Sequence, residues 1–119
     1  MEKVIFTAEE SSFIVEAEGK KLRVSYDEFY GSHKDAMKFC NEHNGGDESV
    51  ENLRFLAKHR DAIYEELKKL GKETIGGWYW TNELAWRDDS SAFVVYTLNG
   101  NVRYEYRDYY YYARAVSAL

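Results

Sequence analysis

The chain has 119 residues and a formal net charge of −5, with 45% hydrophobic and 31% charged residues. These values predict one globular domain over residues 1–119 and exclude a disordered or fibrous chain. The acidic balance argues against nucleic acid as a partner, because affinity for its backbone comes from clustered cations. No apolar run reaches the roughly 20 residues of a membrane span, and the N-terminus lacks a basic stretch followed by an apolar run. We therefore expect no membrane insertion and no signal peptide. The expectation is a soluble protein, cytoplasmic when made, and attachment to a virion or a cell surface through a partner stays open.

Short β-branched and aromatic runs predict strands in the N-terminal part of the chain. Residues 3–7 and 12–17 form the first such runs, and residues 22–26 alternate apolar with polar side chains, which is the period of a half-buried strand. Residues 18–20 between them contain glycine and predict a hairpin turn.

Two helices are predicted in the middle of the chain. Ser32 and Asp35 have the spacing of a helix N-cap, an apolar series follows, and residues 44–46 (Asn-Gly-Gly) should end this helix. A longer helix should run over residues 50–70 with Gly71 as its C-cap. An interruption near His59 is an open alternative.

Cys40 is the single cysteine of the chain, which excludes an intrachain disulfide and a multi-thiolate metal site. His33, Cys40 and His43 are the one set with spacing that a metal could use. Cys40 shares a helix face with Met37, however, so we interpret it as a core residue. We expect no metal and no cofactor.

The composition changes near residue 76. Residues 76–119 hold 12 of the 20 aromatic side chains, including all three tryptophans and eight of the eleven tyrosines, while the last lysine is Lys72. Tyrosine, tryptophan and arginine with little lysine is typical of binding surfaces. The alternative is a tyrosine-rich β-sheet, because tyrosine also favours strands.

A hairpin is the strongest local prediction in this C-terminal part. Residues 91–98 and 102–107 are strand candidates, and Asn99-Gly100 between them is a strong signal for a tight turn. A final strand is predicted over residues 110–116. In the second strand of the hairpin, residues 102, 104 and 106 share one face and residues 103, 105 and 107 share the other, so one face should be packed and one solvated.

Several of these segments resemble one family of bacterial and phage proteins. The segments are Gly-Trp-Tyr-Trp-Thr-Asn-Glu (77–83), Ala-Phe-Val-Val-Tyr (92–96), the Asn-Gly hairpin and Tyr-Ala-Arg-Ala-Val (112–116), with residues 35–40 and 45–46 upstream. This pattern is similar to the C-type-lectin-like domains of the formylglycine-generating-enzyme-like superfamily. The resemblance implies an α+β, C-type-lectin-like fold with two helices packed on antiparallel β-sheets. The chain departs from the family at residues 47–50, where a Leu-Pro-Thr helix start is usual, and at Ser117, where an arginine is usual.

The resemblance also narrows the function. Formylglycine-type oxidation uses a pair of cysteines, and calcium-dependent sugar binding uses a proline-containing motif, whereas this chain has one cysteine and no proline. The remaining branch is the variable proteins of diversity-generating retroelements, in which a rigid platform displays hypervariable C-terminal residues. We therefore expect a binding protein that is not an enzyme, with residues 76–119 as its variable segment.

The residues expected to bind a protein or cell-surface ligand are aromatic anchors flanked by charges. They are Trp86, Arg87, Asp88, Asp89, Arg103, Arg107, Tyr109, Tyr110 and Tyr111. Tyr79, Trp80 and Arg114 match scaffold positions of the family and are expected to be structural. The alternative function is an assembly module, such as a phage tail or fibre component, in which the tyrosine-rich surface forms a homo-oligomer interface.

Overall fold

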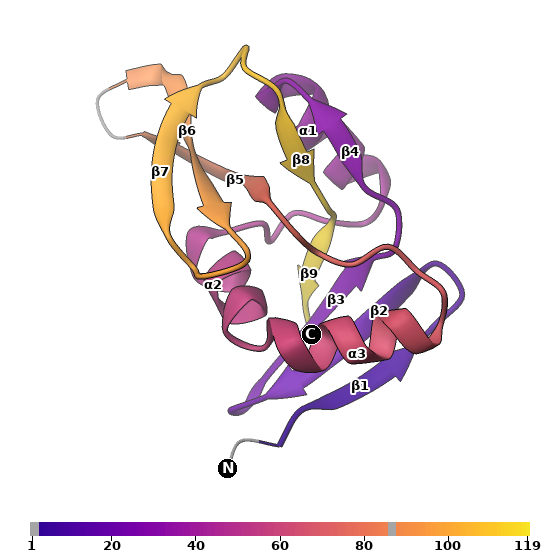
Figure 1. Cartoon of the computed structure of the whole chain (residues 1–119). Coiled ribbons are helices and arrows are strands. Elements are labelled where there is room, and N and C mark those ends of the chain that lie inside the picture. The colour runs from indigo at the N-terminus through magenta and orange to yellow at the C-terminus, as the bar shows by residue number, and fades with distance from the viewer. Residues whose placement is uncertain (1–2, 86–87) are drawn as a thin grey trace.

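A computed structural model describes residues 3–85 and 88–119 of the protein. Over these residues the chain forms a compact α+β fold with three helices and two sheets (Figure 1). The predicted α+β class is confirmed. None of the helices in the described part is long and apolar enough to cross a membrane.

The first sheet joins the two ends of the chain. Its strand order is β1 (Ile5–Ala8), β2 (Ser12–Ala17), β3 (Lys20–Ser25) and β9 (Val116–Ala118), and all neighbours are antiparallel. Ala17 pairs with Lys20, which leaves Glu18 and Gly19 as a two-residue turn with φ of 55° and 74°. Positive φ at both positions is the geometry of the hairpin turn that matches strand twist. The predicted hairpin is confirmed.

The second predicted helix is two helices. After α1 (His33–Glu42) come α2 (Val50–Lys58) and α3 (Arg60–Lys69), which are separated at His59. His59 leaves the helical conformation with ψ of 18°, and its Nε2 lies 2.8 Å from a Glu18 carboxylate oxygen on the β2–β3 turn. The side chain of Ser49 accepts a hydrogen bond from the backbone of Asn52 and so begins α2.

The second sheet carries the C-terminal strands. Its order is β4 (Phe29–Gly31), β8 (Tyr111–Ala113), β5 (Trp78–Ala85), β6 (Asp88–Tyr96) and β7 (Val102–Tyr106). The predicted purely antiparallel arrangement needs one correction, because β5 and β8 run parallel where Tyr79 meets Tyr112.

The prediction of one strand over residues 110–116 is wrong. The chain leaves the second sheet after Ala113 and enters the first sheet at Val116. Between them, the backbone of Ala115 is held by Ser25, because the Ala115 N–H donates to the Ser25 hydroxyl and the Ser25 N–H donates to the Ala115 carbonyl. This crossing links the two sheets.

The β6–β7 hairpin is present, but its turn is longer than Asn99-Gly100. The Tyr96 N–H donates to the Asn101 carbonyl at 2.8 Å, so residues 97–101 form the loop and Gly100 alone has a positive φ among the described loop residues. Thr97 is the first residue of this loop, and its hydroxyl is hydrogen-bonded to the backbone of Gly77.

Two buried clusters hold the fold together. One lies between the first sheet and α2 and α3, and the other lies between α1 and the second sheet. The first cluster includes Phe13, Val15, Leu22, Val24, Leu53, Leu56, Ile63, Leu67, Tyr79 and Val95, and the second includes Ala36, Cys40, Trp80, Val94 and Ala113. The second sheet therefore contributes buried side chains to both clusters, and this packing holds its strands in place.

Glu48 is a buried acid in the link between α1 and α2. One oxygen, Oε2, accepts hydrogen bonds from the backbone N–H groups of Gly46 and Val116, at 2.9 and 2.8 Å. The other, Oε1, is buried without a partner among the described residues. Burial raises the pKa of this carboxyl above its ordinary value, against the two N–H groups that favour the charged form.

We expect Glu48→Gln to change the pH dependence of stability. Because the native pKa is raised, the contribution of Glu48 to stability is greatest below the ordinary carboxyl pKa and is lost as pH rises toward the raised value. The amide cannot ionise, so the free energy of unfolding of the variant should increase relative to that of the wild type as pH rises from about 4 to about 8. Urea unfolding across this range measures the difference, and parallel pH profiles for the two proteins would contradict a buried ionisable role for Glu48.

Candidate ligand-binding surface

Four tyrosines of the C-terminal part expose more than half of their side chains. The exposed fractions are 66% for Tyr104, 55% for Tyr106, 51% for Tyr109 and 60% for Tyr110. Tyr104 and Tyr106 lie on β7, and Tyr109 and Tyr110 lie in the segment that leads to β8. Figure 1 shows that this segment crosses from β7, at one edge of the sheet, to β8 at the upper end of the molecule.

The first part of this surface is a shallow depression, which we call the tyrosine hollow. It has a volume of about 290 Å³ and is lined by Ser91, Tyr104, Glu105, Tyr106 and Tyr109. Tyr106 and Tyr109 meet edge to face with ring centres 5.5 Å apart. Such rings offer apolar faces together with hydroxyl groups that donate and accept hydrogen bonds.

The second part is a group of aromatic rings in contact, the Tyr30 cluster, which consists of Tyr30, Tyr110 and Tyr112. Tyr30 and Tyr112 are directly paired across β4 and β8, with ring centres 4.9 Å apart, and Tyr110 meets Tyr30 edge to face at 5.9 Å. All three side chains are exposed. The cluster continues inward because Tyr112 also contacts the buried ring of Tyr79 at 5.7 Å.

Tyr111 lies apart from the exposed tyrosines. It is half-buried, and its ring meets the edge of Trp80 with centres 5.2 Å apart. Its hydroxyl donates to the Glu105 carboxylate at 3.2 Å, and burial raises its pKa. Tyr111 therefore supports the sheet from the side of α1, and its chain neighbours on both sides are exposed.

The two predicted arginines are held by neighbouring groups. Arg103 lies over the ring of Trp78, with its guanidinium 4.2 Å from the ring centre, and pairs with Glu105 at 3.8 Å. Arg107 is half-buried and donates from Nη1 to the Asp89 carbonyl at 2.9 Å. Arg103 remains more than half exposed and is the arginine available to a ligand.

Arg107 also fixes the start of the tyrosine-bearing segment. Its Nε donates to Nδ1 of His33 at 3.2 Å, while Nε2 of His33 donates to the Thr81 carbonyl at 2.8 Å. A histidine that accepts at one nitrogen and donates at the other is neutral. Burial lowers the pKa of His33, and the Arg107 charge lowers it further, which agrees with this assignment. The segment after β7 is thus attached to the N-terminus of α1.

The remaining predicted residues lie near the β5–β6 connection. Trp86 and Arg87 lie outside the described residues. Asp88 begins β6 and pairs with Ala85 through its backbone, and Asp89 is exposed. Since Asp89 binds Arg107 through its carbonyl, the start of β6 and the start of the tyrosine-bearing segment lie side by side.

The exposed tyrosines that sequence reasoning missed are Tyr30, Tyr104, Tyr106 and Tyr112. The alternation of side chains in residues 102–106 was a signal for Tyr104 and Tyr106, because it places both on one face of the strand. Val102, Tyr104 and Tyr106 on one face of β7 are all exposed, while on the other face Arg103 is exposed and Glu105 is half-buried. Nothing in the sequence near Tyr30 marks it, because it joins the surface only through its pairing with Tyr112.

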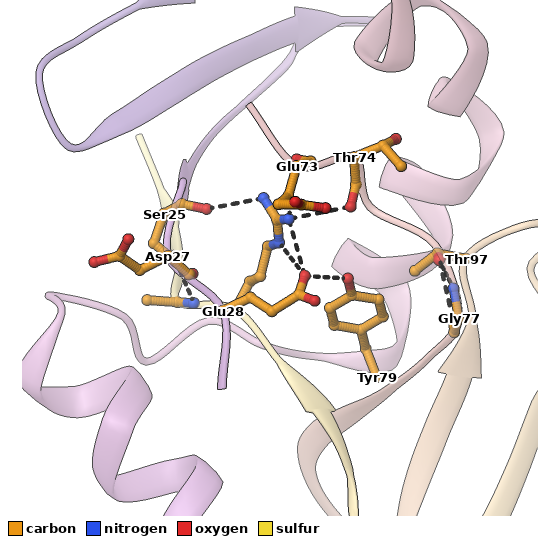
Figure 2. Close-up of polar contacts among 10 residues, drawn as sticks. Ser25, Asp27, Glu28, Glu73, Thr74, Gly77, Tyr79 and Thr97 are labelled. Carbon is orange, nitrogen blue, oxygen red and sulfur yellow. Dashed lines mark hydrogen bonds and ion pairs between the residues drawn. The ribbon is translucent and has the colours of Figure 1, made fainter. Parts of the chain in front are cut away.

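An ion pair between buried Arg114 and partly buried Glu28 supports the sheet next to the Tyr30 cluster. Arg114 is 2% exposed, and its Nε and Nη2 donate to one Glu28 oxygen at 3.0 and 2.9 Å. The Tyr79 hydroxyl donates to the same oxygen at 2.7 Å, and Figure 2 shows Tyr79 pointing at Glu28. Arg114 also donates to the carbonyls of Glu73 and Thr74. This network agrees with the structural role expected for Arg114 and Tyr79.

A groove larger than the tyrosine hollow lies elsewhere on the molecule. It has a volume of about 1110 Å³ and runs over α2, between the β2–β3 turn and the β6–β7 loop. Its charged lining is largely paired internally, because Lys20 binds Glu51 and Lys58 binds Glu18. None of the predicted site residues lines it, and we do not assign the site there.

The three candidate metal ligands, His33, Cys40 and His43, make hydrogen bonds and ring contacts within the fold. His33 bonds to Thr81 and Arg107, and the ring of His43 stacks on Phe39. The Cys40 thiol is buried, donates to the Arg114 carbonyl, and has a raised pKa. In residues 3–85 and 88–119, no three His, Cys, Asp or Glu side chains are grouped as a metal site would need.

Comparison of this chain with protein-family models, with curated proteins and with solved structures found no match.

Proposed function

We propose that this protein binds a ligand or receptor, without catalysing a reaction, through the tyrosine hollow and the Tyr30 cluster. The observation that carries the proposal is the exposure of Tyr104, Tyr106, Tyr109 and Tyr110. Exposed apolar surface of this kind is costly unless a partner covers it. Tyrosine loses little conformational entropy when it is immobilised, and its hydroxyl adds hydrogen bonds, so a few such residues give affinity to a protein or cell-surface ligand.

The way in which these tyrosines are supported favours a variable binding surface. The tyrosine-bearing segment is held by Arg107, His33 and the Asp89 backbone, while the exposed rings contact mainly each other. Replacement of an exposed ring therefore leaves the buried contacts intact. This is what the resemblance to the variable proteins of diversity-generating retroelements requires, and it supports the assignment of residues 76–119 as the variable segment.

A C-type-lectin-like architecture belongs to the same proposal. In its favour are the strands at both chain ends in one sheet, the helices in the middle of the chain, and a second sheet made mainly from the C-terminal part. The buried positions of Tyr79 and Trp80 and the buried Arg114 agree with the scaffold roles that the resemblance implies.

A variable surface must be replaceable without loss of the fold. We expect simultaneous Tyr104→Ser, Tyr106→Ser, Tyr109→Ser and Tyr110→Ser substitutions to cost about 0.5 kcal/mol each, or about 2 kcal/mol together. Urea unfolding measures this cost. Tyr64→Ser on α3 is a matched control, since Tyr64 is also exposed and lies outside the proposed surface. A cost of several kcal/mol for each exposed tyrosine would show that these rings hold the fold, and would contradict the proposal.

A further inference from the structure

Strand β7 forms a free edge of the second sheet. It pairs with β6 on one side and is the last strand in the sheet order. Figure 1 shows β7 along the left side of the second sheet, next to β6. The β6–β7 pairing runs without a register shift over Ser91–Val95, and the strand contains no lysine or proline to block its edge.

The backbone groups that face outward can be assigned from the ladder. The N–H of Tyr96 donates to the Asn101 carbonyl and the N–H of Arg107 donates to the Ser90 carbonyl, so odd-numbered residues face β6. Val102, Tyr104 and Tyr106 therefore direct their N–H and carbonyl groups away from the sheet. Among the described residues, one of these outward groups has a hydrogen-bond partner: the Tyr106 carbonyl accepts from the Tyr109 N–H.

We infer that β7 pairs with β7 of a second copy of this chain, antiparallel, about a two-fold axis at Tyr104. In this register the Tyr104 residues of the two copies face each other as a hydrogen-bonded pair, and Val102 faces Tyr106 in the same way. Arg103 of each copy then faces Glu105 of the other in a close, non-hydrogen-bonded pair. The strand is thus complementary to itself in backbone groups, in apolar side chains and in charge.

Charge selects this register over its neighbours. A shift of the axis to residue 103 places Arg103 opposite Arg103, and a shift to residue 105 places Glu105 opposite Glu105. Like charges directly opposite each other destabilise strand pairing. Within one chain Arg103 and Glu105 are already 3.8 Å apart, so pairing of two copies creates a group of four alternating charges.

The other sheet edges fit a second copy less well. Strands β4 and β9 have three residues each, and β1 has four, with the sequence Ile-Phe-Thr-Ala and no charge to set a register. Strand β7 has five residues and carries both charges. Pairing through its backbone leaves Tyr109 and the Tyr30 cluster outside the new ladder, so the inferred dimer presents two copies of this part of the proposed binding surface and forms without any ligand.

The test is a charge exchange measured by sedimentation equilibrium. The wild type should show a monomer–dimer equilibrium, and Arg103→Glu or Glu105→Arg alone should weaken it about tenfold or more, because each creates like-charge pairs. An equimolar mixture of the two single variants should form a heterodimer, since the introduced glutamate faces the introduced arginine. The mixture result cannot arise from damage to the monomer fold. Tyr64→Ser serves as the control that leaves dimerisation unchanged.

A second variant keeps the inference testable if the charge variants unfold. Tyr104→Pro removes an outward N–H and no bond to β6, which an edge strand tolerates. It should remain folded by circular dichroism and should be monomeric. A wild type that stays monomeric into the millimolar range would overturn the inference, and so would a dimer that is indifferent to the charge changes. Neither result would bear on ligand binding by the tyrosines, so failure of the dimer and failure of the proposed function can be told apart.

Discussion

Arg114→Ala should destabilise the protein by about 3 to 5 kcal/mol, because it removes a buried guanidinium and leaves the partly buried Glu28 carboxylate and three backbone carbonyls without their donor. The guanidinium donates to the Glu28 carboxylate and to the backbone carbonyls of Ser25, Glu73 and Thr74. Figure 2 shows these acceptors converging on one point. Since these acceptors come from separate segments, loss of the guanidinium should also destabilise the stretch of chain that connects β8 in the second sheet to β9 in the first. Urea unfolding at neutral pH measures the effect.

Arg23→Ala is the matched control for this experiment. Arg23 also binds a glutamate, Glu9, at 2.7 Å, but both side chains are more than one third exposed. Exposed pairs contribute about 0 to 1 kcal/mol. Equal losses of unfolding free energy for the two substitutions would show that the burial of Arg114 adds nothing to stability, and would contradict its role in the scaffold.

Trp80→Ala should cost about 3 to 5 kcal/mol through loss of buried contacts and the cavity that remains. Trp80 is 1% exposed and lies in the cluster between α1 and the second sheet. Its indole N–H donates to the Gly31 carbonyl at 2.9 Å, so the substitution also leaves a buried acceptor without its donor. Because the ring of Tyr111 packs against Trp80, the segment that carries the exposed tyrosines should become less ordered. Thermal unfolding and hydrogen exchange report both effects.

Trp78→Ala provides the comparison within the same strand. Trp78 points to the same face as Trp80 but is only half-buried, between Tyr96 and Arg103. Its replacement should cost clearly less than replacement of Trp80. If Trp78→Ala proved as damaging as Trp80→Ala, the central position of Trp80 in the second cluster would be wrong.

Local signals in the sequence predicted the elements that depend on local energies. The Glu18-Gly19 turn, the cap at Ser32 and the end of α1 before Asn44 all follow from conformational preferences of the residues themselves. The break at His59 was only an open alternative, because the Glu18 side chain that His59 contacts is distant in sequence.

The errors arose where tertiary contacts decide. Residues 110–116 have the composition of one strand, but the bonds between Ala115 and Ser25 divide it between two sheets. In β7 the sequence shows two alternating faces and does not say which is covered. The tyrosine face is exposed, while Glu105 on the opposite face is half-buried and accepts a hydrogen bond from Tyr111. Tyr30 joins the surface only through strand pairing, so no local signal could reveal it.

The most direct test of a variable binding surface is natural variation at these positions. Sequencing of this gene across many isolates would compare replacements in residues 76–119 with those in residues 1–75. We expect replacements concentrated at Tyr104, Tyr106, Tyr109 and Tyr110 and in adenine-containing codons, with Trp80 and Arg114 unchanged. Uniformly low variation along the chain would contradict the account and would indicate a surface with one fixed partner.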